Sequence, residues 1–144
     1  MGDAAQSPAK PFLTRRVSVS KMIKKHTLVV DDDRAIRTLL KILLEASGYT
    51  VDTAQNGWEG LMKLGHADYD LVLLDYLMPG ITGLMVLQHI QEHYPILPVV
   101  MLTGHTDCRL EARACAAGAR ACLYKPFNWV ELKEVLSCSV GTAP

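Results

Sequence analysis

The sequence predicts an α/β domain with a five-stranded parallel sheet and helices on both faces. Short apolar runs alternate with longer segments of helical period, which is typical of successive βα units. The runs at residues 28–30, 71–74 and 99–102 are apolar at every position, as in strands covered by helices on both sides. With 144 residues, 49% of them hydrophobic and 21% charged, the chain fits one globular domain with a core.

Five strands are expected, each short and most of them ending at a polar or charged residue. The runs are too short for helices of ordinary length, and helical segments separate them. The expected strands cover Thr27–Asp31, Thr50–Thr53, Tyr69–Asp75, Pro98–Thr103 and Ala121–Tyr124.

Five helices are expected between and after these strands. The first begins after Asp33, whose side chain can cap it, and ends near Gly48. The last has Asn128 at its N-cap and Glu131 three residues later, which is a capping-box pattern. The three helices between them are expected over residues 57–65, 83–93 and 106–117.

The formal net charge of zero conceals a split along the chain. Residues 1–26 carry six Lys/Arg against one acid, a net charge of +5, and residues 27–144 carry nine against fourteen, a net charge of −5. The first 25 residues lack a sustained period and are expected to be a disordered basic tail. The predicted domain covers residues 26–140, with a short tail at 141–144.

Several partners and compartments are disfavoured by the same composition. A neutral chain gives no strong electrostatic case for binding nucleic acid or an anionic membrane surface. No run reaches the roughly 18 apolar residues of a membrane helix, and the basic N-terminus lacks the apolar region of a secretory signal. We therefore expect a cytoplasmic protein whose four cysteines are small buried thiols that stay reduced.

Polar side chains gather at the carboxyl ends of the predicted strands. Asp31 and Asp32 end the first strand, Asp75 the third, Thr103 the fourth, and Lys125 follows the fifth. In an open parallel sheet these ends line one edge, and ligands bind there. The five residues are therefore expected to meet in one shallow pocket.

Three carboxylates in such a pocket favour a hard cation. Mg²⁺ prefers oxygen ligands and is usually held by one or two carboxylates together with a phosphate oxygen. A carboxylate that the metal leaves partly free can attack phosphorus and form an aspartyl phosphate. The ammonium of Lys125 and the hydroxyl of Thr103 supply the charge neutralisation and positioning that phosphoryl transfer needs.

Four stretches in this order and spacing resemble the receiver domain of two-component response regulators. The resemblance covers about residues 26–138 and implies a (βα)5 flavodoxin-like fold. The stretches are Leu28-Val29-Val30-Asp31-Asp32-Asp33, Leu71-Val72-Leu73-Leu74-Asp75 followed by Met78-Pro79-Gly80 and Gly83, Met101-Leu102-Thr103-Gly104-His105, and Lys125-Pro126-Phe127.

The resemblance also implies roles for individual residues. Asp75 would accept a phosphoryl group from a sensor histidine kinase or a histidine phosphotransfer protein. Asp31 and Asp32 would hold Mg²⁺ together with Asp75 and the main-chain carbonyl of Leu77. Lys125 would contact the acyl phosphate, aimed by a cis peptide bond to the following proline. Such a domain assists its own phosphorylation and dephosphorylation and is not an enzyme in the ordinary sense.

The sequence departs from the family at the residues expected to change conformation on phosphorylation. Receivers usually carry Tyr or Phe three residues before the lysine, and this chain has Cys122 there, while Tyr124 lies on the opposite side of the strand from Lys125. We expect Thr103 still to follow the phosphate inward, and the output face to respond through the helix at 106–117. Leu77, two residues after Asp75, cannot orient an attacking water, which predicts slow loss of the phosphate.

Two other functions are compatible with parts of the sequence. A pseudo-receiver would use the same fold as a scaffold without phosphorylation, but every site residue is present. His89-Ile90-Gln91-Glu92-His93 matches the HxxEH zinc-peptidase motif, with no third ligand evident and the strand-end acids unexplained. The sequence after residue 140 contains no output module, so the chain is expected to act through a partner or to be the excised receiver of a longer regulator.

Overall fold

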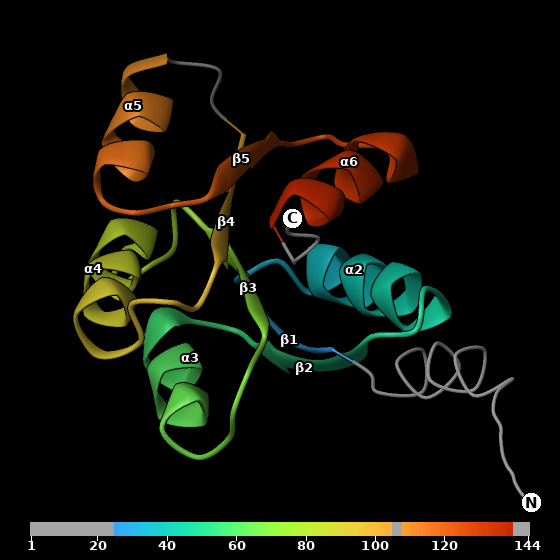
Figure 1. Cartoon of the computed structure of the whole chain (residues 1–144), viewed down its shortest axis with the longest axis horizontal. Helices are drawn as coiled ribbons and strands as arrows, with labels where there is room; N and C mark the ends of the chain where they lie inside the picture. The colour runs from blue at the N-terminus through green and yellow to red at the C-terminus, as the bar shows by residue number, and fades with distance from the viewer. Residues whose placement is uncertain (1–24, 105–107, 140–144) are drawn as a thin grey trace, which may run out of the picture.

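The computed structural model describes residues 25–104 and 108–139, which fold around one central sheet (Figure 1). All strand pairs are parallel, and the strand order is β2-β1-β3-β4-β5. The strands are β1 (His26–Val30), β2 (Thr50–Ala54), β3 (Leu71–Asp75), β4 (Val99–Thr103) and β5 (Ala121–Tyr124).

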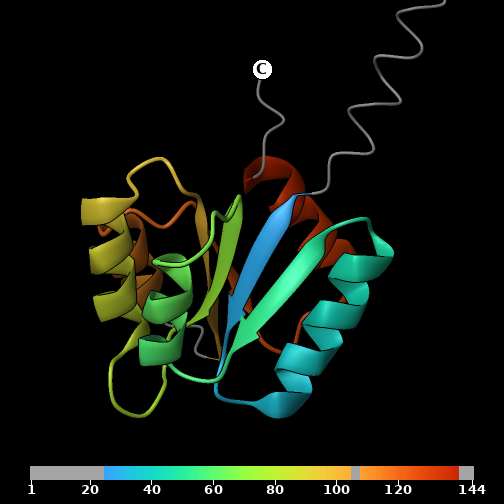
Figure 2. The same cartoon turned by 90° about the horizontal axis from the view of Figure 1, so that it is seen from below.

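Helices cover both faces of this sheet. Figure 2 shows α3 and α4 on one side of the strands and α2 and α6 on the other. A five-stranded parallel sheet wound in this way confirms the predicted (βα)5 flavodoxin-like fold. The helices are α2 (Arg34–Ala46), α3 (Gly57–Leu64), α4 (Gly83–His93), α5 (Cys108–Ala116) and α6 (Trp129–Ser139).

The core consists of two apolar layers, one on each face of the sheet. Alternate residues of each strand point to opposite faces, so Leu28 and Val30 join one layer and Val29 joins the other. The first layer includes side chains of α3, α4 and α5, and the second includes Leu40 and Leu132 from α2 and α6. β3 and β4 are buried at every position, as their uninterrupted apolar sequences predict.

The predicted caps are confirmed at both ends of the domain. The side chain of Asp33 accepts a hydrogen bond of 2.8 Å from the N–H of Ala35, at the start of α2. Asn128 and Glu131 exchange side-chain to backbone hydrogen bonds of 2.8 and 3.0 Å, which completes the expected capping box before α6. Both helices therefore begin where the local sequence dictates.

The cysteines and the chain termini differ from, or lie outside, what the sequence predictions could be compared with. Cys115 and Cys138 are exposed free thiols, so the expectation that the cysteines are buried is wrong for them. The predicted tails at 1–25 and 141–144 fall outside the described residues except for Lys25, as does the expected start of the fourth helix at 106–107. None of the described helices has the length and apolar character to span a membrane.

Candidate functional site

The loop after β1 holds two acids at the carboxyl edge of the sheet. Asp31 is completely buried, and its Oδ1 accepts a hydrogen bond of 2.9 Å from the N–H of Asp33. The guanidinium of Arg37, one turn into α2, donates a hydrogen bond of 2.8 Å to the carbonyl of Asp31. The loop is thus tied to the first helix at both the side chain and the backbone of Asp31. Sequence reasoning missed the role of Arg37.

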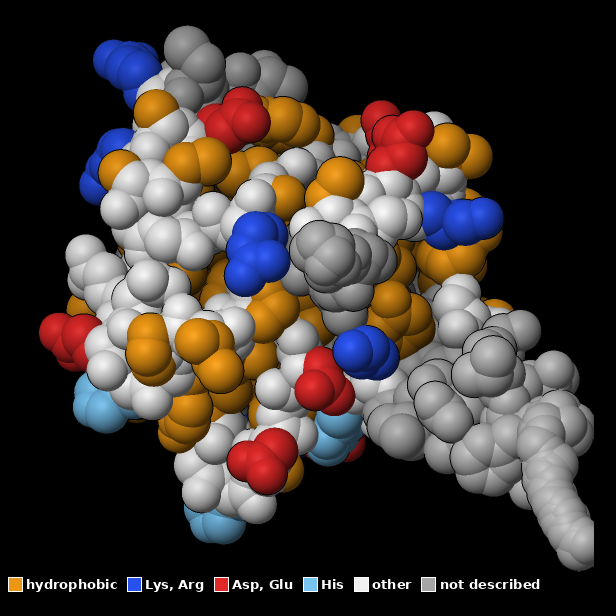
Figure 3. Space-filling view, in the orientation of Figure 1, with side chains coloured by type: hydrophobic (Ala, Val, Ile, Leu, Met, Phe, Trp, Pro, Cys, Tyr) orange, Lys and Arg blue, Asp and Glu red, His pale blue; other side chains and the backbone are white. Residues whose placement is uncertain are grey.

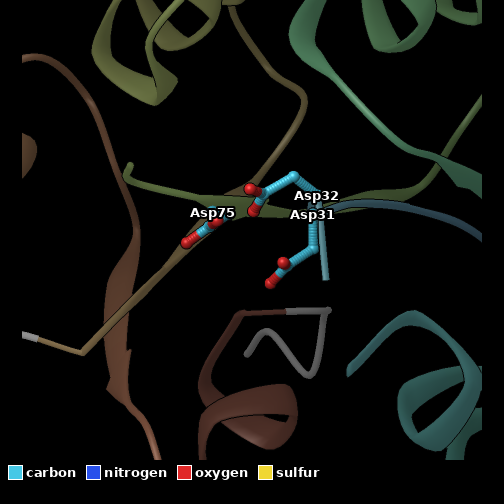
Figure 4. Close-up of side chains that lie close together, drawn as sticks. All are labelled: Asp31, Asp32 and Asp75. Atoms are coloured by element: carbon cyan, nitrogen blue, oxygen red, sulfur yellow. The ribbon is translucent and has the colours of Figure 1, made fainter. Parts of the chain in front are cut away.

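Asp75 ends β3 and lies beside this loop. Its residue is 4% exposed, and carboxylate oxygens of Asp31, Asp32 and Asp75 all lie within 4.8 Å of one another. Figure 4 shows the three side chains converging from the neighbouring ends of β1 and β3. The structure therefore brings together the three acids that the sequence places at strand ends.

Lys125 reaches the same acids from the end of β5. Its Nζ lies 3.1 Å from Oδ1 of Asp75, to which it donates a hydrogen bond, and 2.8 Å from Oδ2 of Asp31. The Lys125–Pro126 peptide bond is cis, as predicted. Burial lowers the pKa of Lys125, but its contacts with Asp31 and Asp75 outweigh burial and leave that pKa above its ordinary value.

One carboxylate oxygen in the pocket keeps unused bonding capacity. Oδ2 of Asp31 is buried, and Nζ of Lys125 lies 2.8 Å from it in an ion pair. A carboxylate oxygen has more than one lone pair, so a single ammonium leaves capacity for a further electrophile. Together with the oxygen-only donor set of the three acids, this atom makes the pocket a fit for Mg²⁺.

The surroundings of Asp75 raise the proton affinity of its carboxylate. Burial, followed by the nearby charge of Asp31, raises the pKa of Asp75 to about 7, although Lys125 acts in the opposite direction. A carboxyl with this pKa is only partly ionised at neutral pH while no cation is bound. A divalent cation in the pocket would favour the ionised, nucleophilic form.

Thr103 and Leu77 border the acids from two directions. Thr103 ends β4, is 5% exposed, and its carbonyl accepts a hydrogen bond of 2.7 Å from the N–H of Lys125. Leu77 lies two residues after the end of β3, and the residue is 53% exposed. Its side chain offers no hydrogen-bonding group at this edge of the sheet.

The switch region keeps an aromatic residue, although not at the usual position. Cys122 is half-buried in β5, and burial, Cys115 and Glu111 together raise the pKa of its thiol to about 11. Tyr124, on the same face of β5, donates a hydrogen bond of 2.6 Å to the carboxylate of Glu111 in α5. In α5, Ala112 and Cys115 are exposed and do not lie in the core, and the side chain of Cys108 is outside the described residues.

Comparison with known proteins identifies the family. The sequence profile of the response regulator receiver domain matches residues 27–137, most of the chain. The chain belongs to this family. It is 41% identical over 100 residues to the DNA-binding transcriptional regulator NtrC of Escherichia coli K12, and 41% identical over 101 residues to the transcriptional regulatory protein ResD of Bacillus subtilis. These matches cover 69% and 70% of this chain but only 21% and 42% of those proteins.

Solved receiver structures share the fold of this receiver domain. The chemotaxis protein CheY4 of Vibrio cholerae superimposes with a TM-score of 0.79 at 32% identity, covering 82% of this chain and 100% of that one. The response regulator TrrA of Thermotoga maritima, solved in complex with Mg²⁺-BeF, has a TM-score of 0.72 at 42% identity, covering 78% and 96%. The protein is thus a receiver domain of two-component signalling with an acidic pocket at the expected edge.

The geometry gives no support to a zinc peptidase. Among the described residues, the only cluster of three or more His, Cys, Asp or Glu side chains positioned to hold a metal is the acidic one. His89 and His93 stand on α4 without a third protein ligand in that part of the chain. A catalytic zinc site requires three protein ligands and an open position for water.

Proposed function

We propose that this receiver domain is a phosphoacceptor switch in which Asp75 takes a phosphoryl group from a sensor histidine kinase or a histidine phosphotransfer protein. The observation that carries the proposal is the convergence of three carboxylates and the Lys125 ammonium at one edge of the sheet. Three carboxylates, one Mg²⁺ and one lysine sum to zero charge before the phosphoryl group arrives. The pocket can therefore accept further negative charge.

The chemistry assigned to each group follows from its position. An oxygen of Asp75 attacks phosphorus while the bond between phosphorus and the histidine nitrogen breaks, and the imidazole keeps the electron pair and takes up a proton. Mg²⁺, held by Asp31, Asp32, Asp75 and the Leu77 carbonyl, would neutralise charge on the phosphoryl oxygens. Lys125, already bonded to Asp75, would move its ammonium to the new phosphate, and the Thr103 hydroxyl would follow.

The output is proposed by analogy with the relatives. NtrC and ResD are transcriptional regulators, and the matched part of this chain covers less than half of their length. We propose that phosphorylation alters the face formed by α5 and β5, where Tyr124 bonds Glu111, and that a partner or a further domain reads the change. With Cys122 in place of the usual aromatic, Thr103 and Tyr124 would carry the rearrangement.

Phosphorylation by a small donor tests the proposal without knowledge of the kinase. We expect the chain incubated with acetyl phosphate and Mg²⁺ to gain the mass of one phosphoryl group by intact-mass spectrometry, and excess EDTA to prevent the gain. Asp75→Asn should show no added phosphate. Asp33→Asn is a matched control, because it removes an exposed acid beside the pocket and Asn is an equally good N-cap. No gain in the wild type would favour the scaffold function, and a gain in Asp75→Asn would overturn the assigned site.

Leu77 is expected to slow the loss of phosphate. Its exposed side chain cannot hold a water molecule for attack on phosphorus, whereas an amide at this position can. We expect Leu77→Asn to shorten the lifetime of the phosphorylated protein roughly tenfold or more, within the usual range for a positioned polar group. Leu77→Ala is the control for loss of bulk. Equal lifetimes for wild type and Leu77→Asn, measured by phosphate release, would contradict the role.

A further inference from the structure

Two histidines stand together on α4, away from the acidic pocket. His89 and His93 are four residues apart, so they lie on one face of the helix. Their rings stack with centroids 4.1 Å apart and an interplanar angle of 22°. His93 is exposed and His89 half-buried. Figure 3 shows a pale-blue histidine surface beside α4.

The backbone sets the tautomer of His93. Its Nδ1 lies 3.0 Å from the carbonyl oxygen of His89. A carbonyl oxygen only accepts hydrogen bonds, so Nδ1 carries the proton and the lone pair remains on Nε2. A hydrogen bond from one ring nitrogen to a backbone carbonyl is the arrangement that orients histidine ligands in metal sites. His93 is therefore prepared to bind a metal through Nε2.

We propose that His89 and His93 form a bidentate site for a borderline divalent cation such as Ni²⁺, Cu²⁺ or Zn²⁺. Imidazole nitrogen suits these ions, whereas Mg²⁺ takes oxygen ligands, so this site and the acidic pocket select different metals. The ring centroids lie 4.1 Å apart, so both imidazoles can reach one ion once the rings turn out of their stacked arrangement. Water would complete the coordination, since the described residues offer no third ligand there. The site therefore binds metal without the machinery of a peptidase.

His66 provides a matched control within the same chain. It is also exposed, and its Nδ1 lies 2.7 Å from the carbonyl oxygen of Met62, so it has the same tautomer. The residues four positions before and after it are Met62 and Asp70, so it has no second imidazole one helical turn away. A His66 variant separates the effect of a histidine pair from that of any exposed histidine.

The test is calorimetric titration of the whole chain with Ni²⁺ at pH 7.5. Saturating Mg²⁺ is present to occupy the acidic pocket, and all samples are alkylated because Cys115 and Cys138 are exposed thiols. Loss of an outer-shell partner alone costs roughly 10–100-fold in metal affinity, so we expect His89→Ala and His93→Ala each to weaken Ni²⁺ binding at least about tenfold. His66→Ala should bind as the wild type does.

A second readout keeps the result independent of the folding of any one variant. Ni²⁺ should raise the thermal midpoint of the wild type and of His66→Ala, but not that of His93→Gln, whose midpoint in EDTA should match the wild type. Equal Ni²⁺ affinities in His66→Ala and His93→Ala would overturn the proposal. The proposal stands apart from phosphorylation, so Asp75→Asn should retain the Ni²⁺ site.

Discussion

Replacing Asp75 by Asn is expected to stabilise the metal-free protein at neutral pH. The carboxylate is buried beside Asp31, and burial and that charge raise its pKa to about 7. At pH 8 the folded protein must hold this group ionised in an unfavourable environment, whereas the unfolded chain holds it in water. An amide of the same shape removes the penalty. One unit of pKa difference between the folded and unfolded states corresponds to about 1.4 kcal/mol. The free energy of unfolding of Asp75→Asn should therefore exceed that of the wild type by an amount on the order of 2–4 kcal/mol.

The stability of the metal-free wild type should fall as the pH rises from 4 to 8. Below pH 4 the group is protonated in both the folded and the unfolded states, and its contribution to stability is then fully present. As the pH rises from about 4 through 7, the unfolded chain loses its proton first, so stability falls until the folded-state pKa is passed. Thermal midpoints measured in EDTA between pH 4 and 8 should therefore differ increasingly between wild type and Asp75→Asn.

Asp33→Asn is the control for the effect of Asp75→Asn on stability. Asp33→Asn removes an exposed carboxylate next to the pocket and should leave the midpoint nearly unchanged at each pH. Adding Mg²⁺ should raise the wild-type midpoint more than that of Asp75→Asn, because a bound cation offsets the charge that the variant lacks. A variant that is less stable than wild type in EDTA at pH 8 would contradict the electrostatic description of the pocket.

Gly83→Ala is expected to damage both stability and phosphorylation. Gly83 opens α4, and its N–H donates a hydrogen bond of 3.0 Å to the carbonyl of Tyr76. A methyl group there would collide with the backbone carbonyl oxygen of Asp75 and lie 2.9 Å from Cα of Tyr76. Backbone atoms cannot rotate away as a side chain can. We expect the free energy of unfolding to fall by about 1–3 kcal/mol or more, as at other overpacked sites. We also expect the collision to displace Asp75.

Gly104→Ala is the matched control for this glycine. Gly104 follows Thr103 at the same edge of the sheet, and an added Cβ would meet no heavy atom of the described residues within 4 Å. The thermal midpoint and the rate of phosphorylation by acetyl phosphate should both fall in Gly83→Ala and stay near wild type in Gly104→Ala. Equal thermal midpoints and equal phosphorylation rates in the two alanine variants would show that α4 does not approach the backbone of Asp75 this closely.

Much of the fold is encoded locally in the sequence. β3 and β4 follow from their uninterrupted apolar runs, and α2 and α6 begin where Asp33 and Asn128 cap them. The polar residues at the strand ends were predictable as a pocket because parallel strands end at one edge. These features depend on periodicity, capping or topology, all of which are visible in one dimension.

Contacts between distant segments were not predictable in the same way. The bond from Arg37 to the Asp31 carbonyl depends on the packing of α2 against the sheet. At the opposite edge, Asp52 accepts hydrogen bonds from the hydroxyl of Tyr69 at 2.7 Å and from Nε2 of His26 at 3.0 Å, and these neighbours, the tyrosine first, lower the pKa of Asp52. These three residues come from separate parts of the chain, and no sequence motif indicates that they meet. The exposure of Cys115 likewise depends on how α5 rests on the sheet, which its sequence leaves open.

We propose that Asp75, and neither of its acidic neighbours, forms the covalent bond to phosphorus. The direct measurement is to phosphorylate the chain with acetyl phosphate and Mg²⁺, reduce the acyl phosphate with borohydride, and locate the resulting homoserine by peptide sequencing in a mass spectrometer. We expect homoserine at position 75, with Asp31 and Asp32 unmodified and no product when EDTA replaces Mg²⁺. Homoserine at position 31 or 32 with Asp75 intact would contradict it.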